Sequence, residues 1–178
     1  GIEIMINAIP VQTKDFTWET TLTLSSNKNK LVNLSNDLYE TDNFMEVGGI
    51  SDPISVATHC MEVGKGLGDF WGLKYVGVDK DGFALVAAKN AAGEWEVTQF
   101  NANLNSEANR QRLGNGMPDV YMGWNNTFRY KGFDLNMQFT GQFGFDILNA
   151  QRCFYENNSI AYNRLKSAAK LYPAINLD

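Results

Sequence analysis

Residues 133–143 have the sequence FDLNMQFTGQF. The odd-numbered positions are apolar or glycine, and the even-numbered positions are polar: Phe133, Leu135, Met137, Phe139, Gly141 and Phe143 alternate with Asp134, Asn136, Gln138, Thr140 and Gln142. Successive side chains of a β-strand point to opposite faces of the sheet. The pattern therefore predicts a strand with one apolar face and one polar face.

The residues before this stretch alternate in the same way. Met122, Trp124, Phe128 and Tyr130 are interleaved with Gly123, Asn125, Thr127 and Arg129, and Asn126 is the one polar interruption of the apolar set. Only Lys131 and Gly132 separate the two runs. A two-residue loop that contains glycine is typical of a β-hairpin, so residues 121–143 are predicted to form one.

The N-terminal end predicts a second hairpin. Residues 2–9 alternate as IEIMINAI, and residues 16–25 alternate as FTWETTLTLS. Residues 11–15 lie between these runs and are expected to form the turn.

Two architectures fit such hairpins. In a soluble β-sandwich the apolar faces lie in a core, and the protein would be an all-β module that binds carbohydrate or peptide. In a transmembrane β-barrel the apolar faces contact lipid and the polar faces line a wet lumen.

Three details favour the barrel. The strands approach the spanning length of about 9–11 residues, very long connections lie opposite the short turns, and aromatic residues gather beside those turns, where a membrane-interface girdle is expected: Phe16, Trp18, Phe128, Tyr130 and Phe133.

Composition narrows the function classes. The chain has 178 residues, of which 44% are hydrophobic and 12% aromatic, which argues against a disordered chain. Its net charge of −5 argues against nucleic acid as a partner, because that binding needs a basic surface. No apolar run approaches the roughly 18 residues of a transmembrane helix.

Residues 26–120 join the two hairpins and are too long for an ordinary loop. Strands are expected at residues 70–78, 83–88 and 94–100, with a tight turn at residues 79–82. Ser106 is expected to cap a short helix that runs to Leu113. A second short helix is expected after Ser159, with Pro173 ending it.

No motif in the chain predicts catalysis, a metal site or a cofactor. The glycine-rich residues 64–68 lack the Lys-Ser/Thr that a phosphate-binding loop needs. Asp79 and Asp81 resemble the start of a calcium loop, but Asn90 stands where that loop has its glutamate. His59 is the only histidine, and no nucleophile motif accompanies it. The two cysteines, Cys60 and Cys153, leave open whether they pair.

The aromatic residues of the middle stretch are the candidate substrate contacts. Trp71, Tyr75 and Trp95 lie among glycine, asparagine and aspartate residues. Flat rings beside amide and carboxylate groups can stack on sugars or peptides and hydrogen-bond to them. The alternative is that these rings form the small core of the middle stretch itself.

Several stretches together resemble the SusC/RagA-type TonB-linked outer-membrane transporters of Bacteroidetes. They are KDFTWET with NKNKLV (residues 14–20 and 27–32), VGKGLGDFWGLKY (63–75), LGNGMP (113–118), NTFRYKGFDL (126–135) and GQFGFDILN (141–149). These stretches cover most of the chain in the order that the family has, and they place it in the C-terminal half of the barrel.

The resemblance implies an all-β fold with antiparallel hairpins of a barrel of about 22 strands and long, partly structured extracellular loops. Residues 1–25 and 121–143 would be barrel hairpins, and residues 26–120 and 144–178 would be extracellular. The family imports glycans or peptides across the bacterial outer membrane, powered by TonB, together with a SusD-like surface lipoprotein. Family members are much longer than this chain and carry a plug domain, so the chain is expected to be one piece of a larger transporter. The family has no catalytic site.

Overall fold

The computed structural model describes residues 1–35, 40–157 and 163–168. The regular secondary structure of the described chain is almost entirely antiparallel β-strand, which confirms the predicted all-β class. It divides into two compact units, Gly1–Lys30 with Gly116–Asp146 and Leu31–Asn115 with Ile147–Asp178. None of the helices in the described residues is long and apolar enough to cross a membrane.

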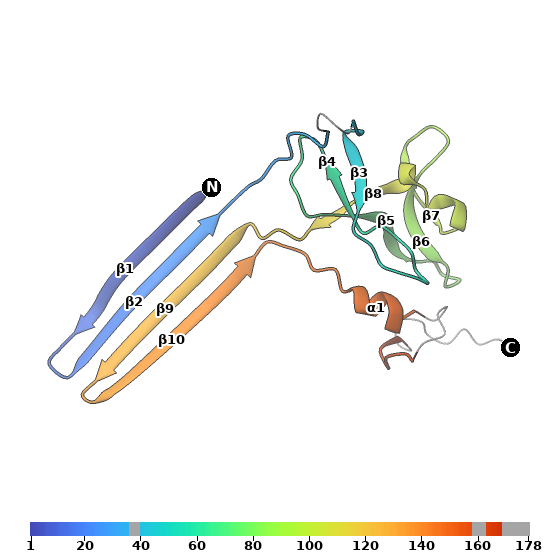
Figure 1. Cartoon of the computed structure of the whole chain (residues 1–178). Helices are drawn as coiled ribbons and strands as arrows, with labels where there is room; N and C mark the ends of the chain where they lie inside the picture. The colour runs from blue at the N-terminus through green and yellow to red at the C-terminus, as the bar shows by residue number, and fades with distance from the viewer. Residues whose placement is uncertain (36–39, 158–162, 169–178) are drawn as a thin grey trace. The chain divides into compact units, whose positions relative to one another are not determined.

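The first unit is a single four-stranded sheet, here called the long sheet. Its strands lie in the order β1 (Ile2–Gln12), β2 (Phe16–Ser26), β9 (Val120–Tyr130) and β10 (Phe133–Phe143), and each has 11 residues (Figure 1). Both predicted hairpins are present, and their inner strands β2 and β9 pair without a register shift. The sheet thus joins segments that are about a hundred residues apart in the sequence.

The N-terminal turn is shorter than the sequence predicts. Val11 and Gln12 still pair with β2, so the turn comprises residues 13–15 rather than 11–15. The register shifts between Ala8 and Val11, and the shift contains Pro10. Proline has no N–H for the ladder, so it is tolerated in a strand at an edge or in a bulge. Because the bulge adds one residue to β1, Val11 lies on the same face of the sheet as Ala8, opposite Trp18.

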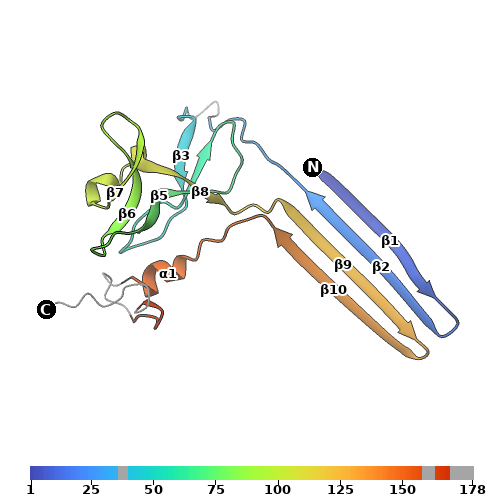
Figure 2. The same ribbon diagram turned by 180° about the vertical axis from the view of Figure 1, so that it is seen from behind.

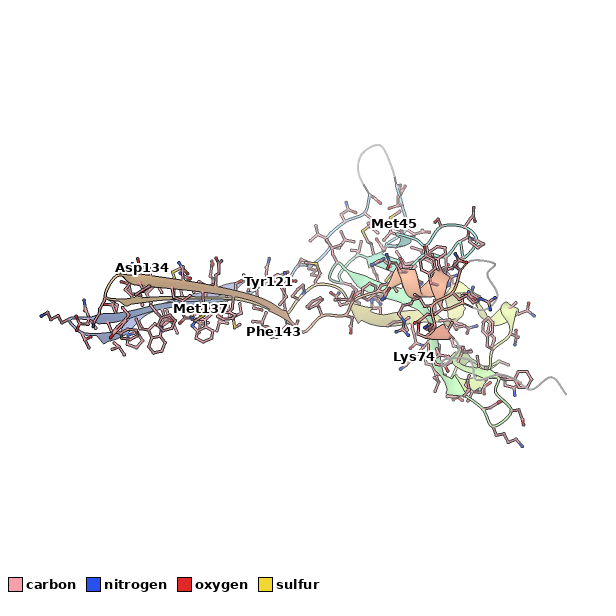
Figure 3. The ribbon with its side chains drawn as sticks, turned by 90° about the horizontal axis from the view of Figure 1, so that it is seen from below. Met45, Lys74, Tyr121, Asp134, Met137 and Phe143 are labelled. Carbon is pink, nitrogen blue, oxygen red and sulfur yellow. The ribbon has the colours of Figure 1, made fainter. Side chains whose placement is uncertain are left out.

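The pairing register places all the apolar sets on one face of the long sheet. Trp18 lies opposite Phe128, which lies opposite Leu135, and Leu22 lies opposite Trp124, which lies opposite Phe139. In Figure 3 the labelled Met137 and Phe143 point to one side of this sheet, and Tyr121 and Asp134 point to the other. The face that carries Met137 is called the apolar face below, and its opposite is the polar face.

The second unit is a six-stranded antiparallel arrangement (Figure 2). It contains β3 (Phe44–Val47), β4 (His59–Glu62), β5 (Asp69–Val78), β6 (Ala84–Lys89) and β7 (Trp95–Gln99) in that order, and β8 (Arg110–Asn115) pairs with β5. The N-terminal half of β5 pairs with β4 and β8, and its C-terminal half pairs with β6. The strands expected at residues 70–78, 83–88 and 94–100 are therefore confirmed as β5, β6 and β7.

The turn between β5 and β6 is also confirmed. The Asp79 carboxylate accepts hydrogen bonds from the backbone N–H groups of Asp81 and Phe83, both at 2.9 Å. These bonds hold the pKa of this exposed carboxyl below its usual value, with the Phe83 N–H as the main cause.

The helix expected at residues 106–113 is wrong. A single 3₁₀ turn, Glu107–Asn109, follows Ser106, and the chain then becomes β8 because residues 110–115 find hydrogen-bond partners on β5. A helix that the sequence did not predict, α1 (Ala150–Tyr155), begins after Asn149, whose side chain caps it. The helix expected after Ser159 lies largely outside the described residues.

The two units differ in what they bury. Every buried hydrophobic side chain among the described residues belongs to the second unit: Ile50, Cys60, Val86, Ala88 and Ala168. The apolar face of the long sheet remains open, and Phe133, Leu135 and Phe143 are each more than half exposed. A soluble sandwich would require such a face to be buried in a core.

Candidate functional site

The predicted membrane-interface aromatics gather at one end of the apolar face. Phe16, Tyr130 and Phe133 are directly opposite one another in the register, beside the two hairpin turns. Phe128 stacks between Phe16 and Trp18, with ring centroids 6.4 and 5.7 Å apart. The Lys131 ammonium lies 5.3 Å from the centre of the Tyr130 ring. A cluster of rings with a polar rim is the arrangement that a membrane–water interface favours.

Two tryptophans also shield polar groups in the middle of the apolar face. The Trp18 indole N–H donates to the Asn126 side-chain oxygen at 3.1 Å, and the Trp124 indole N–H donates to the Thr20 hydroxyl at 2.9 Å. Asn126 is only 2% exposed although the sheet is a single layer. The polar interruption of the sequence pattern is thus covered by rings and hydrogen-bonded, as a polar group in an apolar surrounding must be.

The opposite face of the long sheet carries hydroxyl, amide and charged groups. Thr21 donates to Asn7 across β1 and β2 at 2.8 Å, and Arg129 pairs with Glu19 across β2 and β9 at 2.7 Å. The Arg129 and Glu19 side chains are 51% and 41% exposed. This face suits contact with water, as the lumen side of a barrel requires.

The second unit is organised around an ion network on one face of β3, β4, β5 and β8. Arg110 donates to Glu46 at 2.6 Å, and the Trp71 indole N–H donates to the same carboxylate at 2.7 Å. Arg112 donates to Asp69 at 2.7 Å and also pairs with Glu62. Partial burial alone would lower the pKa of Arg112, but the hydrogen bonds that its guanidinium donates to Glu62 and Asp69 outweigh burial, so the pKa is raised.

A hollow of about 750 Å³ opens beside this network. Its lining combines aromatic, charged and small residues: Phe44, Glu62, Trp71, Lys89, Ser106, Glu107, Ala108 and Arg110. The volume falls in the range of small-molecule sites, roughly 300–1,000 Å³.

The three predicted substrate-contacting aromatics have different surroundings. Trp71 lines the hollow, with Phe44 at 5.1 Å between ring centroids and the Arg112 guanidinium 6.0 Å from its ring centre. Trp95 is 49% exposed and lies under the Lys89 ammonium, 5.3 Å from the ring centre. Tyr75 is 63% exposed. No ring–ring contact joins these three described residues, and only Trp71 lines the hollow.

Sequence reasoning missed the ion network. Its members come from positions as far apart as 46 and 110, and no local spacing links them. The one signal was Arg110-Gln111-Arg112, because period-two spacing puts both arginines on the same face of a strand.

The residues considered for other chemistry, His59, Cys60 and Cys153, have the following surroundings. The His59 ring packs on Phe70 at 4.9 Å between centroids, and its Nδ1 lies 2.8 Å from the Thr58 hydroxyl. Cys60 and Cys153 are both free thiols, and burial raises the pKa of Cys60 although Arg112 opposes the shift. Within the described part of the chain, no three His, Cys, Asp or Glu residues group as a metal site requires.

The sequence matches named proteins although no family model matches it. TonB-dependent receptor P3 of Formosa agariphila is 32% identical over 155 residues, which are 84% of this chain and 15% of that receptor. TonB-dependent receptor P26 of the same organism is 29% identical over 154 residues, with the same coverage of each chain. This chain is related to the TonB-dependent receptors. It spans about 15% of the length of these relatives.

The fold comparison agrees with this relationship. A chain in the structure of the RagAB peptide transporter matches with a TM-score of 0.64 and 21% identity, over 87% of this chain and 16% of that one. The SusC/RagA-type resemblance read from the sequence motifs is therefore confirmed. So is the expectation that the TonB-dependent receptor relatives are far longer than this chain.

Proposed function

We propose that this chain is a segment of a TonB-dependent transporter in the bacterial outer membrane, one that imports glycans or peptides and catalyses no reaction. The observation that carries the proposal is the two-faced, single-layer long sheet. An exposed apolar face of this extent needs lipid or protein to cover it, and a barrel wall satisfies the backbone groups of its strands only when further strands close it.

The proposal assigns a place to each part of the chain. Residues 1–25 and 121–143 form barrel hairpins, with the apolar face toward lipid and the short turns toward the periplasm. Phe16, Trp18, Phe128, Tyr130 and Phe133 lie near the membrane interface at that end. Residues 26–120 and 144–178 face the outside of the cell.

The partners follow from this placement. A SusD-like surface lipoprotein would contact the extracellular part, and TonB would act through parts of the protein that this chain does not include. Trp71, Tyr75 and Trp95 are proposed to contact the substrate. The matched RagAB structure is that of a peptide transporter, which supports transport in general and leaves open the choice between glycan and peptide for this chain.

The test is fractionation combined with uptake in the source cells. The proposal expects the whole protein in the outer-membrane fraction, and it expects uptake of a labelled glycan or peptide mixture to stop when either this gene or the TonB gene is disrupted. A protein found in the soluble fraction, with uptake unchanged by both disruptions, would contradict the proposal.

A further inference from the structure

The hairpin turns of the long sheet bring a lysine to one end of the apolar face. The backbone N–H of Lys131 donates to the Asp15 carbonyl at 2.9 Å, so the β9–β10 turn lies beside the β1–β2 turn. Phe16, Tyr130 and Phe133 stand next to these turns at directly opposed positions of the three neighbouring strands. The apolar face thus ends in a row of three rings, with Lys131 beside the central one.

The ammonium of Lys131 lies over that central ring. Its distance from the centre of the Tyr130 ring is 5.3 Å, and the face of an aromatic ring attracts a cation. Tyr130 is 51% exposed and Phe133 is 80% exposed. The ammonium and the rings are therefore open to whatever covers this end of the apolar face.

The backbone of Lys131 is held in an uncommon conformation. Its φ is 52°, in the left-handed region that glycine and asparagine adopt most readily. The hydrogen bond to Asp15 anchors this residue to the neighbouring hairpin. The turn therefore fixes where the lysine side chain starts, and the Tyr130 ring fixes where its ammonium lies.

No carboxylate pairs with this ammonium among the residues that the structure describes. Glu19 pairs with Arg129 on the polar face, and Asp134, which is opposite Arg129 in the register, also points to that side (Figure 3). Asp15 offers Lys131 its backbone carbonyl, and no ion pair joins their side chains. The row of rings therefore carries a positive charge that the described part of the chain does not neutralise.

We infer that Lys131 binds the phosphate of a membrane phospholipid, with Tyr130 and Phe133 against the glycerol and the first part of the acyl chains. A phospholipid has an anionic end followed by an apolar end, and the sheet offers an ammonium at the turn followed by rings. An ammonium forms strong charge-assisted hydrogen bonds with phosphate, and aromatic rings favour the headgroup level of a membrane. The inference rests on the proposed function, in which the apolar face contacts lipid, and it assigns one lipid group to one residue.

The experiment uses the whole receptor in detergent micelles and follows acetylation of its lysines by N-acetoxysuccinimide. Dimyristoyl phosphatidylglycerol is titrated into the micelles, and peptide mass spectrometry measures the rate at each lysine. An ammonium bound to phosphate must leave it and lose a proton before it reacts. Saturating lipid is therefore expected to slow acetylation of Lys131 by about tenfold or more, the usual worth of a hydrogen bond to a charged group.

Two other lysines are internal controls in the same samples. Lys80 is exposed in the turn between β5 and β6, and its rate is expected to stay unchanged. Lys14 is exposed in the turn beside Lys131, so it reports the general effect of a negatively charged micelle at the same end of the sheet. Lys14 is expected to be slowed much less than Lys131.

Two further additives identify the source of the phosphate. Dimyristoylglycerol has the same acyl chains without the phosphate, and glycerophosphoglycerol has the same headgroup without the chains. Neither is expected to protect Lys131 at the concentration at which the phospholipid does. Protection by glycerophosphoglycerol alone would indicate a site for soluble phosphate esters, and protection by dimyristoylglycerol would indicate simple coverage by lipid chains.

A pair of variants tests the role of the ring. Tyr130→Leu keeps an apolar side chain but removes the ring face that positions the ammonium. It is expected to raise the phospholipid concentration for half-protection of Lys131 by about two- to fivefold, the worth of an exposed cation–π contact. Phe139→Leu, further along the apolar face, is the matched control and is expected to leave that concentration unchanged.

Three results would overturn the inference: phosphatidylglycerol leaves the rate at Lys131 unchanged, either additive protects as well as the phospholipid does, or Lys14 is slowed as much as Lys131. Equal half-protection concentrations for Tyr130→Leu and Phe139→Leu would overturn the role given to the ring. Cell fractionation separates the two proposals. A receptor located in the outer membrane whose Lys131 is not protected refutes only this inference, and one absent from the outer membrane refutes the proposed function.

Discussion

The long sheet and the second unit hold similar ion pairs in different surroundings. On the long sheet, Glu19 and Arg129 pair across strands with about half of each side chain exposed. In the second unit, Glu46 and Arg110 are 25% and 15% exposed, and the same carboxylate also binds Trp71. The second unit builds its own small interior from buried apolar groups and linked charges, whereas the apolar side chains of the long sheet stay exposed. The second unit is therefore stabilised by contacts within the chain, whereas in the proposed function the long sheet is stabilised by the lipid that covers its apolar face.

The largest expected loss of stability comes from placing a charge on the apolar face of the long sheet. Met137→Arg is expected to destabilise the whole receptor in lipid vesicles by about 2–4 kcal/mol, the cost of arginine on a lipid-facing strand near the midplane. Gln138→Arg, one residue along on the polar face, is the matched control and is expected to be nearly neutral. Urea unfolding monitored by tryptophan fluorescence measures both, and equal costs at the two positions would contradict the two-faced account.

The second unit is tested through its ion network. Glu46→Ala removes the partner of Arg110 and of the Trp71 N–H, and we expect it to weaken local stability by about 1–3 kcal/mol. Hydrogen exchange of the β3 and β8 amides measures the effect. Glu19→Ala removes the exposed pair of the long sheet and is expected to cost less than about 1 kcal/mol. A larger loss of stability from Glu19→Ala than from Glu46→Ala would contradict the expected difference between the two units.

The tryptophan cover of the long sheet predicts a smaller, rescuable effect. Trp18→Phe leaves the buried Asn126 oxygen without its donor, which is expected to cost about 1 kcal/mol. Adding Asn126→Leu to the same protein removes the unsatisfied group and should restore most of that stability. If the double variant is no more stable than Trp18→Phe, then the indole N–H is not what satisfies Asn126.

The smallest expected effect concerns Cys60, whose pKa is raised by burial. A thiol whose pKa is higher in the folded state than in the unfolded state contributes to the free energy of unfolding at pH values below its unfolded pKa. That contribution is lost as the pH rises through the folded pKa. Cys60, which is 1% exposed, should therefore react with iodoacetamide near neutral pH much more slowly than Cys153, and the difference should narrow at alkaline pH. Peptide mass spectrometry of the two sites measures the rates, and equal rates near neutral pH would show that Cys60 is accessible.

The long sheet and the second unit also differ in how well the sequence predicts them. The strands of the long sheet could be predicted because the alternation of apolar and polar residues is a local signal, repeated over 11 residues in each strand. The bulge at Pro10 was missed because it depends on the partner strand. In the second unit the tight turn at residues 79–82 was predicted from Asp79 and glycine, but residues 110–113 were assigned to a helix. Their pairing with β5, about forty positions earlier, decides the outcome, and no local pattern reveals it.

The candidate site shows the same limit. Trp71 was singled out for its ring, and it does line the hollow. Lys89 and Glu107 were not singled out, because exposed charges are common and only the fold brings these two to one hollow.

The central claim is that the apolar face of the long sheet contacts lipid. The most direct test places single cysteines at positions 133–143 of a receptor that lacks Cys60 and Cys153, labels them with a fluorophore, and measures quenching by brominated lipid. The account predicts strong quenching at odd positions such as Phe139 and weak quenching at even positions such as Thr140 along the whole strand. Quenching that is weak at every position, or that shows no period of two, would contradict it.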